Sequence, residues 1–185
     1  ARATPVRRSP GLHGDDKHTT FRWRHRMLAL PRNDRQTPLT GIVEADEMYV
    51  LESQKGARKL QRPPRKRGGR ASKPGISSEQ VCVLIARDRD GRTVDAVPGN
   101  RPVTAAQLGV HLAPVLAPAV LPVTDAHAAC RSFASTHGIR HAFVNVSAGE
   151  RVRGEVHVQN VNAYLARLRG WLAHFRGVAT RYLAN

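Results

Sequence analysis

Apolar and polar positions along the first half of the chain alternate as expected for strands. Residues 41–50, GIVEADEMYV, have the length and β-branched content of a strand, and residues 81–88, VCVLIARD, form a nearly continuous apolar run. The Asp90-Gly91 pair is a tight-turn signal before a third strand at 93–97. The pattern therefore predicts one strand followed by a β-hairpin.

The second half of the chain alternates between helical and strand patterns. Thr104 is a candidate cap for the helix that follows it. In order, the pattern predicts a helix at 105–116, a short apolar strand at 119–125 that ends in Asp125, a helix at 126–137 and a strand at 139–146.

The last helix, at 157–174, has the clearest periodicity. Its apolar positions step by four and three residues and form one stripe: Val161, Leu165, Leu168, Leu172 and Phe175. Asn162 and Arg169 are seven positions apart, so they share a flank beside that stripe. The order of strands and helices predicts an α/β fold in which a sheet of mixed direction is flanked by helices.

The first 30 residues differ in composition from the rest of the chain. Residues 1–20 are rich in Arg, Pro, Gly and His without apolar periodicity, which predicts a disordered leader. Residues 21–30, FRWRHRMLAL, predict a short basic helix that ends at Pro31. The chain does not begin with Met and has no signal-peptide pattern, so we expect a fragment or a truncated reading frame.

The charge of the chain changes this picture, since 30 Lys and Arg against 14 Asp and Glu give a formal net charge of +16. A surplus of this size favours a polyanionic partner, because cations that neutralise phosphates release bound counterions. Nucleic acid is the leading candidate. A ribosome-associated basic protein, or a GC-rich genome that inflates Arg, would also account for the charge.

The surplus is concentrated between residues 53 and 78, where no acidic residue occurs. Pro and Gly interrupt this segment, and it has too few apolar residues to build a core, so it predicts a basic mobile loop. A solvated linker is the alternative to a phosphate-gripping loop. The candidate DNA-binding residues are Lys55, Arg58, Lys59, Arg62, Arg65, Lys66, Arg67, Arg70 and Lys73.

Cysteine and apolar patterns exclude other classes of protein. Cys82 and Cys130 are far apart and form no CxxC pair, so they predict small core residues in a reduced cytosol rather than a disulfide framework or a zinc ribbon. The longest mostly apolar run, 111–123, is short and broken by prolines, so no membrane span is expected. The histidines at 127, 137, 141 and 157 lack a zinc-site spacing.

The acidic residues of the first predicted strand need partners. Strand geometry places Glu44 and Asp46 on one face, about 6.6 Å apart, and Glu47 on the other. Two buried carboxylates on one face repel each other, so we expect a cation nearby. Glu44 and Glu47 could tune a metal site, or they could form salt bridges to the basic loop.

Asp46, Asp125 and a polar residue early in the last helix form a possible metal site. Carboxylates from separate elements can hold two divalent ions about 3.5 to 4 Å apart for phosphodiester chemistry. Hard oxygen ligands suit Mg²⁺ or Mn²⁺. The alternative for Asp125 is an ordinary turn or cap residue at the end of a strand.

The chain resembles the DDE-type transposases of bacterial insertion sequences, specifically the ISXO-type group with an RNase H-like catalytic domain. The matching stretches follow the family order and cover most of residues 20–185: FRWRH, GIVEADEMYV, ESQKGAR, PRKRGG, VLIARDRDG, VTDAH and HVQNVNAYLARLRGWLAHFRGVATRYL. The resemblance implies that residues 39–185 form the catalytic domain. Residues 1–38 would be a basic leader and the remnant of an N-terminal DNA-binding region.

The resemblance also implies roles for single residues. It places the first catalytic aspartate at Asp46 and the second at Asp125. The third position, Glu in many members and Asn in others, falls on Asn162, and a Lys seven positions later is replaced by Arg169. Because Asn162 offers a neutral carbonyl oxygen, it should contribute less to metal affinity than a Glu would. Arg169 keeps the positive charge but lacks the compact ammonium group of Lys.

The implied activity is metal-dependent DNA strand cleavage and strand transfer, with two Mg²⁺ or Mn²⁺ ions. The expected partners are element ends and target DNA, and the active complex is expected to be a homo-oligomer in the bacterial cytoplasm at the nucleoid. An inactive truncated copy, a non-catalytic basic nucleic-acid-binding protein and a structure-specific nuclease on the same fold are the alternatives.

Overall fold

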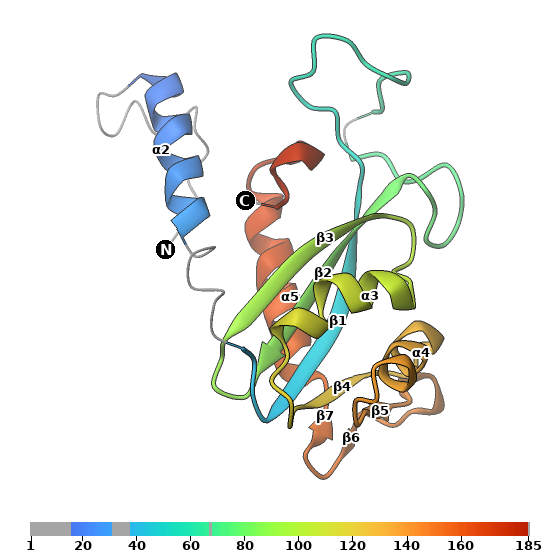
Figure 1. Ribbon diagram of the computed structural model, residues 1–185. Coiled ribbons are helices and arrows are strands. Elements are labelled where there is room, and N and C mark those ends of the chain that lie inside the picture. The colour runs from blue at the N-terminus through green and yellow to red at the C-terminus, as the bar shows by residue number, and fades with distance from the viewer. Residues whose placement is uncertain (1–15, 31–37, 67, 185) are drawn as a thin grey trace.

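The computed structural model describes residues 16–30, 38–66 and 68–184. Its centre is a five-stranded sheet of order β3-β2-β1-β4-β5 (Figure 1). β1 pairs antiparallel with β2 and parallel with β4, so the sheet is mixed. The strands are β1 (Ile42–Leu51), β2 (Gln80–Asp88), β3 (Thr93–Asn100), β4 (Leu121–Asp125) and β5 (Ala142–Val144).

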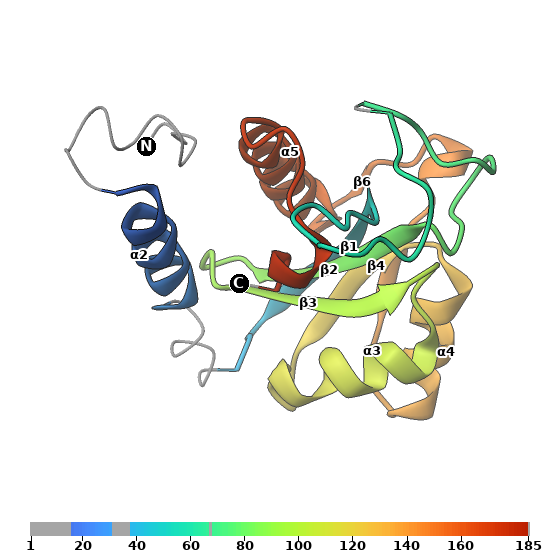
Figure 2. The same ribbon diagram turned by 90° about the horizontal axis from the view of Figure 1, so that it is seen from above.

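Helices cover both faces of this sheet, with α3 (Ala105–His111) and α4 (Ala128–Thr136) on one side and α5 (Gln159–Ala173) on the other (Figure 2). β2 is buried along most of its length because it is an inner strand covered on both faces, which explains its continuous apolar run. This architecture confirms the predicted α/β fold, in which a sheet of mixed direction is flanked by helices.

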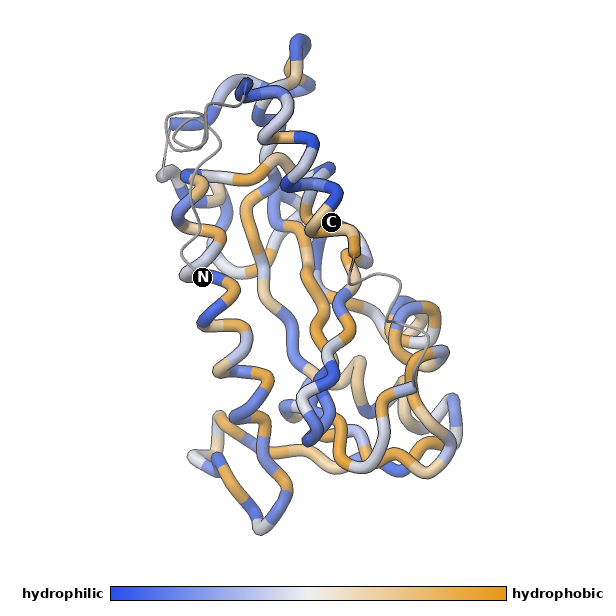
Figure 3. The backbone as a smooth tube through the Cα atoms, turned by 90° about the vertical axis from the view of Figure 1, so that its left-hand side faces the viewer, coloured by the Kyte–Doolittle hydropathy of each residue, from blue (hydrophilic) through white to orange (hydrophobic). Residues whose placement is uncertain are grey.

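Side-chain alternation along β1 separates two apolar cores. Val43 and Ala45 belong to the core under α3 and α4, whereas Met48 belongs to the core under α5. Val161 and Leu165 of α5 are buried in that second core, which confirms the apolar stripe of the last helix. Hydrophobic positions are concentrated along the central strands, and the loop between β1 and β2 is mostly hydrophilic (Figure 3).

Several boundaries differ from the predictions. The helix predicted at 105–116 has the expected Thr104 capping box but ends at His111, because Pro114 cannot donate a backbone hydrogen bond and belongs to a 3₁₀ turn at Ala113–Val115. β5 is shorter than the predicted strand 139–146. A two-stranded ribbon of β6 (Val152–Arg153) and β7 (Val156–His157) precedes α5 and was not predicted.

Near the N-terminus, α2 (Lys17–Ala29) begins four residues before the predicted segment, and the Asp16 side chain caps it. The rings of Phe21 and His25 lie 5.7 and 4.6 Å from that of Tyr182, so α2 contacts the C-terminal segment. Residues 1–15 of the predicted leader lie outside the described residues. None of the helices in the described ranges has both the length and the apolar character needed to cross a bilayer.

Candidate active site

The two predicted catalytic aspartates lie on neighbouring parallel strands. The register pairs Ile42 with Leu121 and Glu44 with Val123. Extending this register by two residues along both strands places Asp46 opposite Asp125, in agreement with the effect of the Asp125 charge on the pKa of Asp46. Both aspartates have the strand parity of residues that face α5, since Glu44 contacts α5 and Val123 lies in the core beneath it. Neighbouring strands lie about 4.8 Å apart, so the two carboxyl groups lie close together on the face of the sheet that α5 covers.

The surroundings of Asp46 disfavour its charged form. Burial, as the largest cause, raises the pKa of Asp46 to about 6, and the negative charge of Asp125 adds to this effect. The Glu47 N–H, which donates to Asp46 Oδ1 at 2.8 Å, and the cation of Arg169 act in the opposite direction on the pKa. Among the described residues, no cation lies within salt-bridge distance of Asp46 or Asp125.

Asp125 also has a local structural role. Its Oδ1 accepts a hydrogen bond from the His127 N–H at 3.2 Å, in the turn that leads from β4 into α4. Asp125 is therefore a turn residue, as the alternative interpretation holds, and it also lies opposite Asp46. One oxygen of a carboxylate can hold the turn while the other remains available for a ligand.

Asn162 and Arg169 lie on α5, which crosses the same face of the sheet. Both are exposed. The neighbour of Asn162, Val161, donates its backbone N–H to Glu44, two residues before Asp46 in β1. Arg169 is close enough to lower the pKa of Asp46. All four predicted catalytic residues thus belong to β1, β4 and the helix above them.

Glu44 lies in an environment that the sequence did not reveal. Its carboxylate is fully buried and forms an ion pair with Arg89 at 3.0 Å, rather than with the basic loop, and His157 Nδ1 lies 3.3 Å from the same oxygen. It also accepts hydrogen bonds from the Asn160 side chain and from the Val161 N–H, each at 2.9 Å. The expected compensating cation for the acids of β1 is therefore supplied to Glu44 by the turn after β2.

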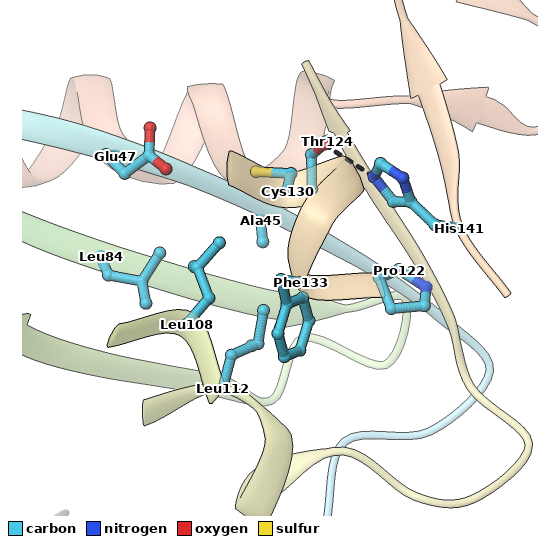
Figure 4. Close-up of a pocket in the computed structure, with 10 residues that line it drawn as sticks. All are labelled: Ala45, Glu47, Leu84, Leu108, Leu112, Pro122, Thr124, Cys130, Phe133 and His141. Carbon is cyan, nitrogen blue, oxygen red and sulfur yellow. Dashed lines mark hydrogen bonds between the residues drawn. The ribbon is translucent and has the colours of Figure 1, made fainter. Parts of the chain in front are cut away.

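Glu47 has the opposite strand parity and lines a small pocket against α3 and α4 (Figure 4). The pocket is mostly apolar, and Leu84, Leu108 and Phe133 are among the residues that line it. Burial raises the pKa of Glu47 to about 7, and the negative charges of Asp46 and Asp125 add to this effect. On the far side of the pocket, Thr124 Oγ1 lies 2.9 Å from His141 Nε2.

The basic loop after β1 is anchored to the protein at several points. Arg62 forms a 2.9 Å ion pair with Glu52, and Arg65 forms one of the same length with Glu79. Lys55 Nζ donates to the carbonyl oxygens of Phe175 and Gly177 at 3.1 and 2.7 Å. All three cations are predicted from the sequence as DNA contacts. In the structure, Arg62 and Arg65 hold the loop against the residues at its two ends, and Lys55 connects it to the C-terminal segment.

The other cations of the loop are available to a ligand. Five of them are exposed, namely Arg58, Lys59, Lys66, Arg70 and Lys73. Arg67 lies outside the described residues. The loop projects beyond the end of β1, at one end of the molecule (Figure 1). Because Arg62 and Arg65 anchor the loop, its exposed cations lie together on a part of the domain that extends beyond the sheet.

The donor set at the aspartates suits a hard divalent cation. In the part of the chain that the structure describes, no group of three or more His, Cys, Asp or Glu side chains could hold a metal. Asp46, Asp125 and Asn162 together offer two carboxylates and one neutral amide oxygen, which are ligands that Mg²⁺ and Mn²⁺ accept. Burial and, to a smaller extent, the negative charge of Asp125 raise the pKa of Asp46, and a bound cation would offset both effects.

Comparison with known proteins identifies the family. Residues 38–185 match the sequence profile of the ISXO2-like transposase domain. The chain belongs to this family. A protein described as an uncharacterised protein in transposable element ISH50, from Halobacterium salinarum, is 29% identical over 142 residues, which are 76% of this chain and 48% of that protein. The chain thus spans about half the length of this curated relative.

Two solved structures are distantly similar to this transposase domain. The Mos1 strand transfer complex is 16% identical, with a TM-score of 0.30 over 86% of this chain and 57% of that chain. The Mos1 transposase paired-end complex with the left transposon end is 17% identical, with a TM-score of 0.28 over 83% and 55%. The resemblance inferred from the sequence motifs is confirmed by the family match.

Proposed function

We propose that this ISXO2-like transposase domain cleaves and joins DNA strands at the ends of its mobile element, with Asp46 and Asp125 as the acidic pair. The observation that supports this most directly is the register of β1 and β4, which brings the two aspartates opposite each other under α5. The raised pKa of Asp46 supports it further, because perturbed carboxyl groups are concentrated at functional sites.

Asp46, Asp125 and Asn162 are the residues that would hold two Mg²⁺ or Mn²⁺ ions. Such ions, when bound, polarise the phosphodiester and make an attacking hydroxyl more nucleophilic. Asn162 adds an oxygen without a charge, so the two aspartates carry the whole negative charge of the ligand set. We therefore expect this site to bind metal more weakly than one with three carboxylates.

Arg169 is proposed to bind a phosphate of the DNA. Its guanidinium is exposed on α5 and lies within electrostatic range of Asp46. A planar guanidinium can donate two parallel hydrogen bonds to phosphate oxygens, which fixes the orientation of the group as well as neutralising its charge. A merely solvated helix arginine is the alternative, and its replacement would leave cleavage unchanged.

The proposed chemistry consists of two in-line displacements at phosphorus. In the first, water attacks a phosphodiester at an element end and the bond to the 3′-oxygen breaks, which frees a 3′-hydroxyl. In the second, that hydroxyl attacks a phosphodiester of target DNA and displaces another 3′-oxygen, so one ester is exchanged for another. No covalent bond to the protein is needed, and the exposed cations of the basic loop hold the DNA backbone in both steps.

The test is a nicking and joining assay with the purified chain, Mn²⁺ and a duplex that carries the terminal repeats flanking the coding sequence. We expect the wild type to nick this duplex and Asp125→Asn to leave it intact while binding it equally well. Equal nicking by both proteins would remove Asp125 from the mechanism. Cleavage without joined products would favour a nuclease.

The high positive charge supports a second candidate, a non-catalytic DNA-binding protein on the same fold. It predicts that wild type binds DNA without divalent ions and never nicks it. It also predicts that Asp46→Asn leaves DNA binding unchanged. Assembly into a homo-oligomer and a location at the bacterial nucleoid in the cytoplasm are further parts of the proposal. Sedimentation of the chain with and without end DNA measures the first of these.

A further inference from the structure

Glu44 lies at the centre of a buried polar cluster beside the candidate site. Its carboxylate has no solvent exposure. Its two oxygens accept hydrogen bonds from the Asn160 side-chain amide and from the Val161 N–H, both at 2.9 Å. Arg89 Nη1 lies 3.0 Å from Glu44 Oε1 and 2.7 Å from His157 Nε2. β1, the turn after β2, and the start of α5 therefore meet at one side chain.

The N-cap residue of α5 provides no capping side chain. It is Val158, whose side chain cannot accept a hydrogen bond, and the nearby His157 Nδ1 accepts only from the first N–H, that of Gln159, at 3.3 Å. The first N–H groups of a helix have no partner within it, and they carry the positive end of the helix dipole. Val161 is the third residue of α5, so the Glu44 carboxylate takes the place of a capping side chain from a position 117 residues away.

We propose that Glu44 is a positioning residue that fixes α5 against β1 and thereby sets Asn162 opposite Asp46 and Asp125. This inference rests on the proposed metal site. Glu44 and Asp46 are two positions apart on one face of β1, and Val161 and Asn162 are adjacent in α5. Two hydrogen bonds to Glu44, from the Asn160 side chain and the Val161 N–H, therefore join the strand that carries one ligand to the helix that carries another.

Arg89 reinforces this connection from a third direction. Its Nη2 donates to the Glu155 carbonyl oxygen at 2.7 Å, next to the β7 residues that lead into α5. The guanidinium neutralises the buried carboxylate and holds the preceding turn at the same time. Without the carboxylate, the N–H of Val161 and the guanidinium would each lose their buried acceptor.

The chemistry of the cluster identifies the informative substitution. Asn160, Val161 and Arg89 all present hydrogen-bond donors to Glu44. Glu44→Gln keeps the size of the side chain but turns an NH₂ group toward donors, so at least one contact is lost. Glu44→Asp keeps the charge on a shorter side chain and is the conservative rescue variant. Glu79→Gln, which breaks an ion pair with Arg65 far from α5, is a matched control.

The first measurement is amide hydrogen exchange without metal or DNA. In Glu44→Gln we expect the Val161 amide to lose protection by about tenfold or more, as for a buried hydrogen bond left without its acceptor. The amides of β2 in Glu44→Gln, and the Val161 amide in Glu79→Gln, should stay as protected as in wild type. Unchanged protection at Val161 in Glu44→Gln would overturn the proposed capping contact.

The second measurement is the affinity of the full chain for Mn²⁺ alone. We expect Glu44→Gln to weaken it by about 10- to 100-fold, as is typical when a residue supporting a metal ligand is replaced. If Glu44 acts through Asn162, the double variant Glu44→Gln, Asn162→Ala should bind no more weakly than the weaker single variant. Glu44→Asp should recover part of the affinity, and it replaces Glu44→Gln if the latter does not fold.

The outcomes separate this inference from the proposed function. Additive losses in the double variant, or normal Mn²⁺ affinity in Glu44→Gln alongside lost affinity in Asp46→Asn, would refute the positioning role and keep the site. If Asp46→Asn and Asp125→Asn bind Mn²⁺ like wild type, the proposed site fails, and with it the role of Glu44 toward Asn162. The exchange experiment then still decides whether Glu44 caps α5.

Discussion

Replacing Asp46 with asparagine should stabilise the metal-free protein, and the gain should depend on pH. The carboxyl group of Asp46 is buried beside Asp125, and its pKa is raised from 3.8 to about 6. Because the folded state holds this proton more tightly than the unfolded state, the wild type loses stability as pH rises through that interval. Above about pH 6 the loss is complete.

The size of the effect follows from the same interval. A difference between 3.8 and about 6 corresponds to roughly 3 kcal/mol, at 1.36 kcal/mol for each pH unit. The asparagine side chain of the variant cannot ionise, but its amide is also partly desolvated, so the net gain should be about 1 to 3 kcal/mol at pH 8. Below pH 4 both side chains are neutral and the two proteins should be about equally stable.

Urea unfolding at pH steps from 3.5 to 8, at constant ionic strength and with a chelator, measures this difference. Glu47→Gln is a matched control, because the raised pKa of Glu47, about 7, moves its own transition to higher pH. A gain for Asp46→Asn that is equal at pH 4 and pH 8 would refute the electrostatic origin. A loss of stability at pH 8 would refute the reasoning altogether.

Further predictions concern metal, the buried cluster and DNA. Adding Mn²⁺ should raise the unfolding temperature of wild type but not of Asp46→Asn, as scanning calorimetry can show. Glu44→Ala should lower the free energy of unfolding by about 1 to 3 kcal/mol, because it leaves the buried Val161 N–H without its acceptor, and urea titration measures this. Lys59→Ala and Arg70→Ala should each reduce the log-log salt slope of duplex DNA binding by about 0.9 if they contact one phosphate. Arg62→Ala should instead speed proteolysis within the loop, since Arg62 anchors it to Glu52.

The elements of this fold were predictable because their signals are local. The alternation in GIVEADEMYV, the Asp90-Gly91 turn and the apolar stripe of the last helix all correspond to structure, since the period of a strand or helix is expressed within one segment. Boundaries were less well predicted, as the early end of α3 and the short β5 show. The β6 and β7 strands are too short to produce a pattern.

The candidate site was predictable only in part. Asp46 and Asp125 were identified by strand position and family resemblance, but their juxtaposition depends on the register of β1 and β4, which no local pattern specifies. The raised pKa of Asp46 likewise arises from burial by elements far away in the chain. Arg62, Arg65 and Lys55, which the sequence predicts as DNA contacts, also have partners within the protein, and charge alone does not reveal those partners.

By itself, the sequence determined which segments form strands and helices, the surplus of positive charge and the acidic residues that merit testing. Only the tertiary structure decided that Glu44 faces the start of α5, that two arginines anchor the basic loop, and that Asp46 and Asp125 share a face. The physical reason is that periodicity reports on neighbours within one turn or strand, whereas hydrogen bonds, ion pairs and desolvation depend on residues brought together from distant parts of the chain.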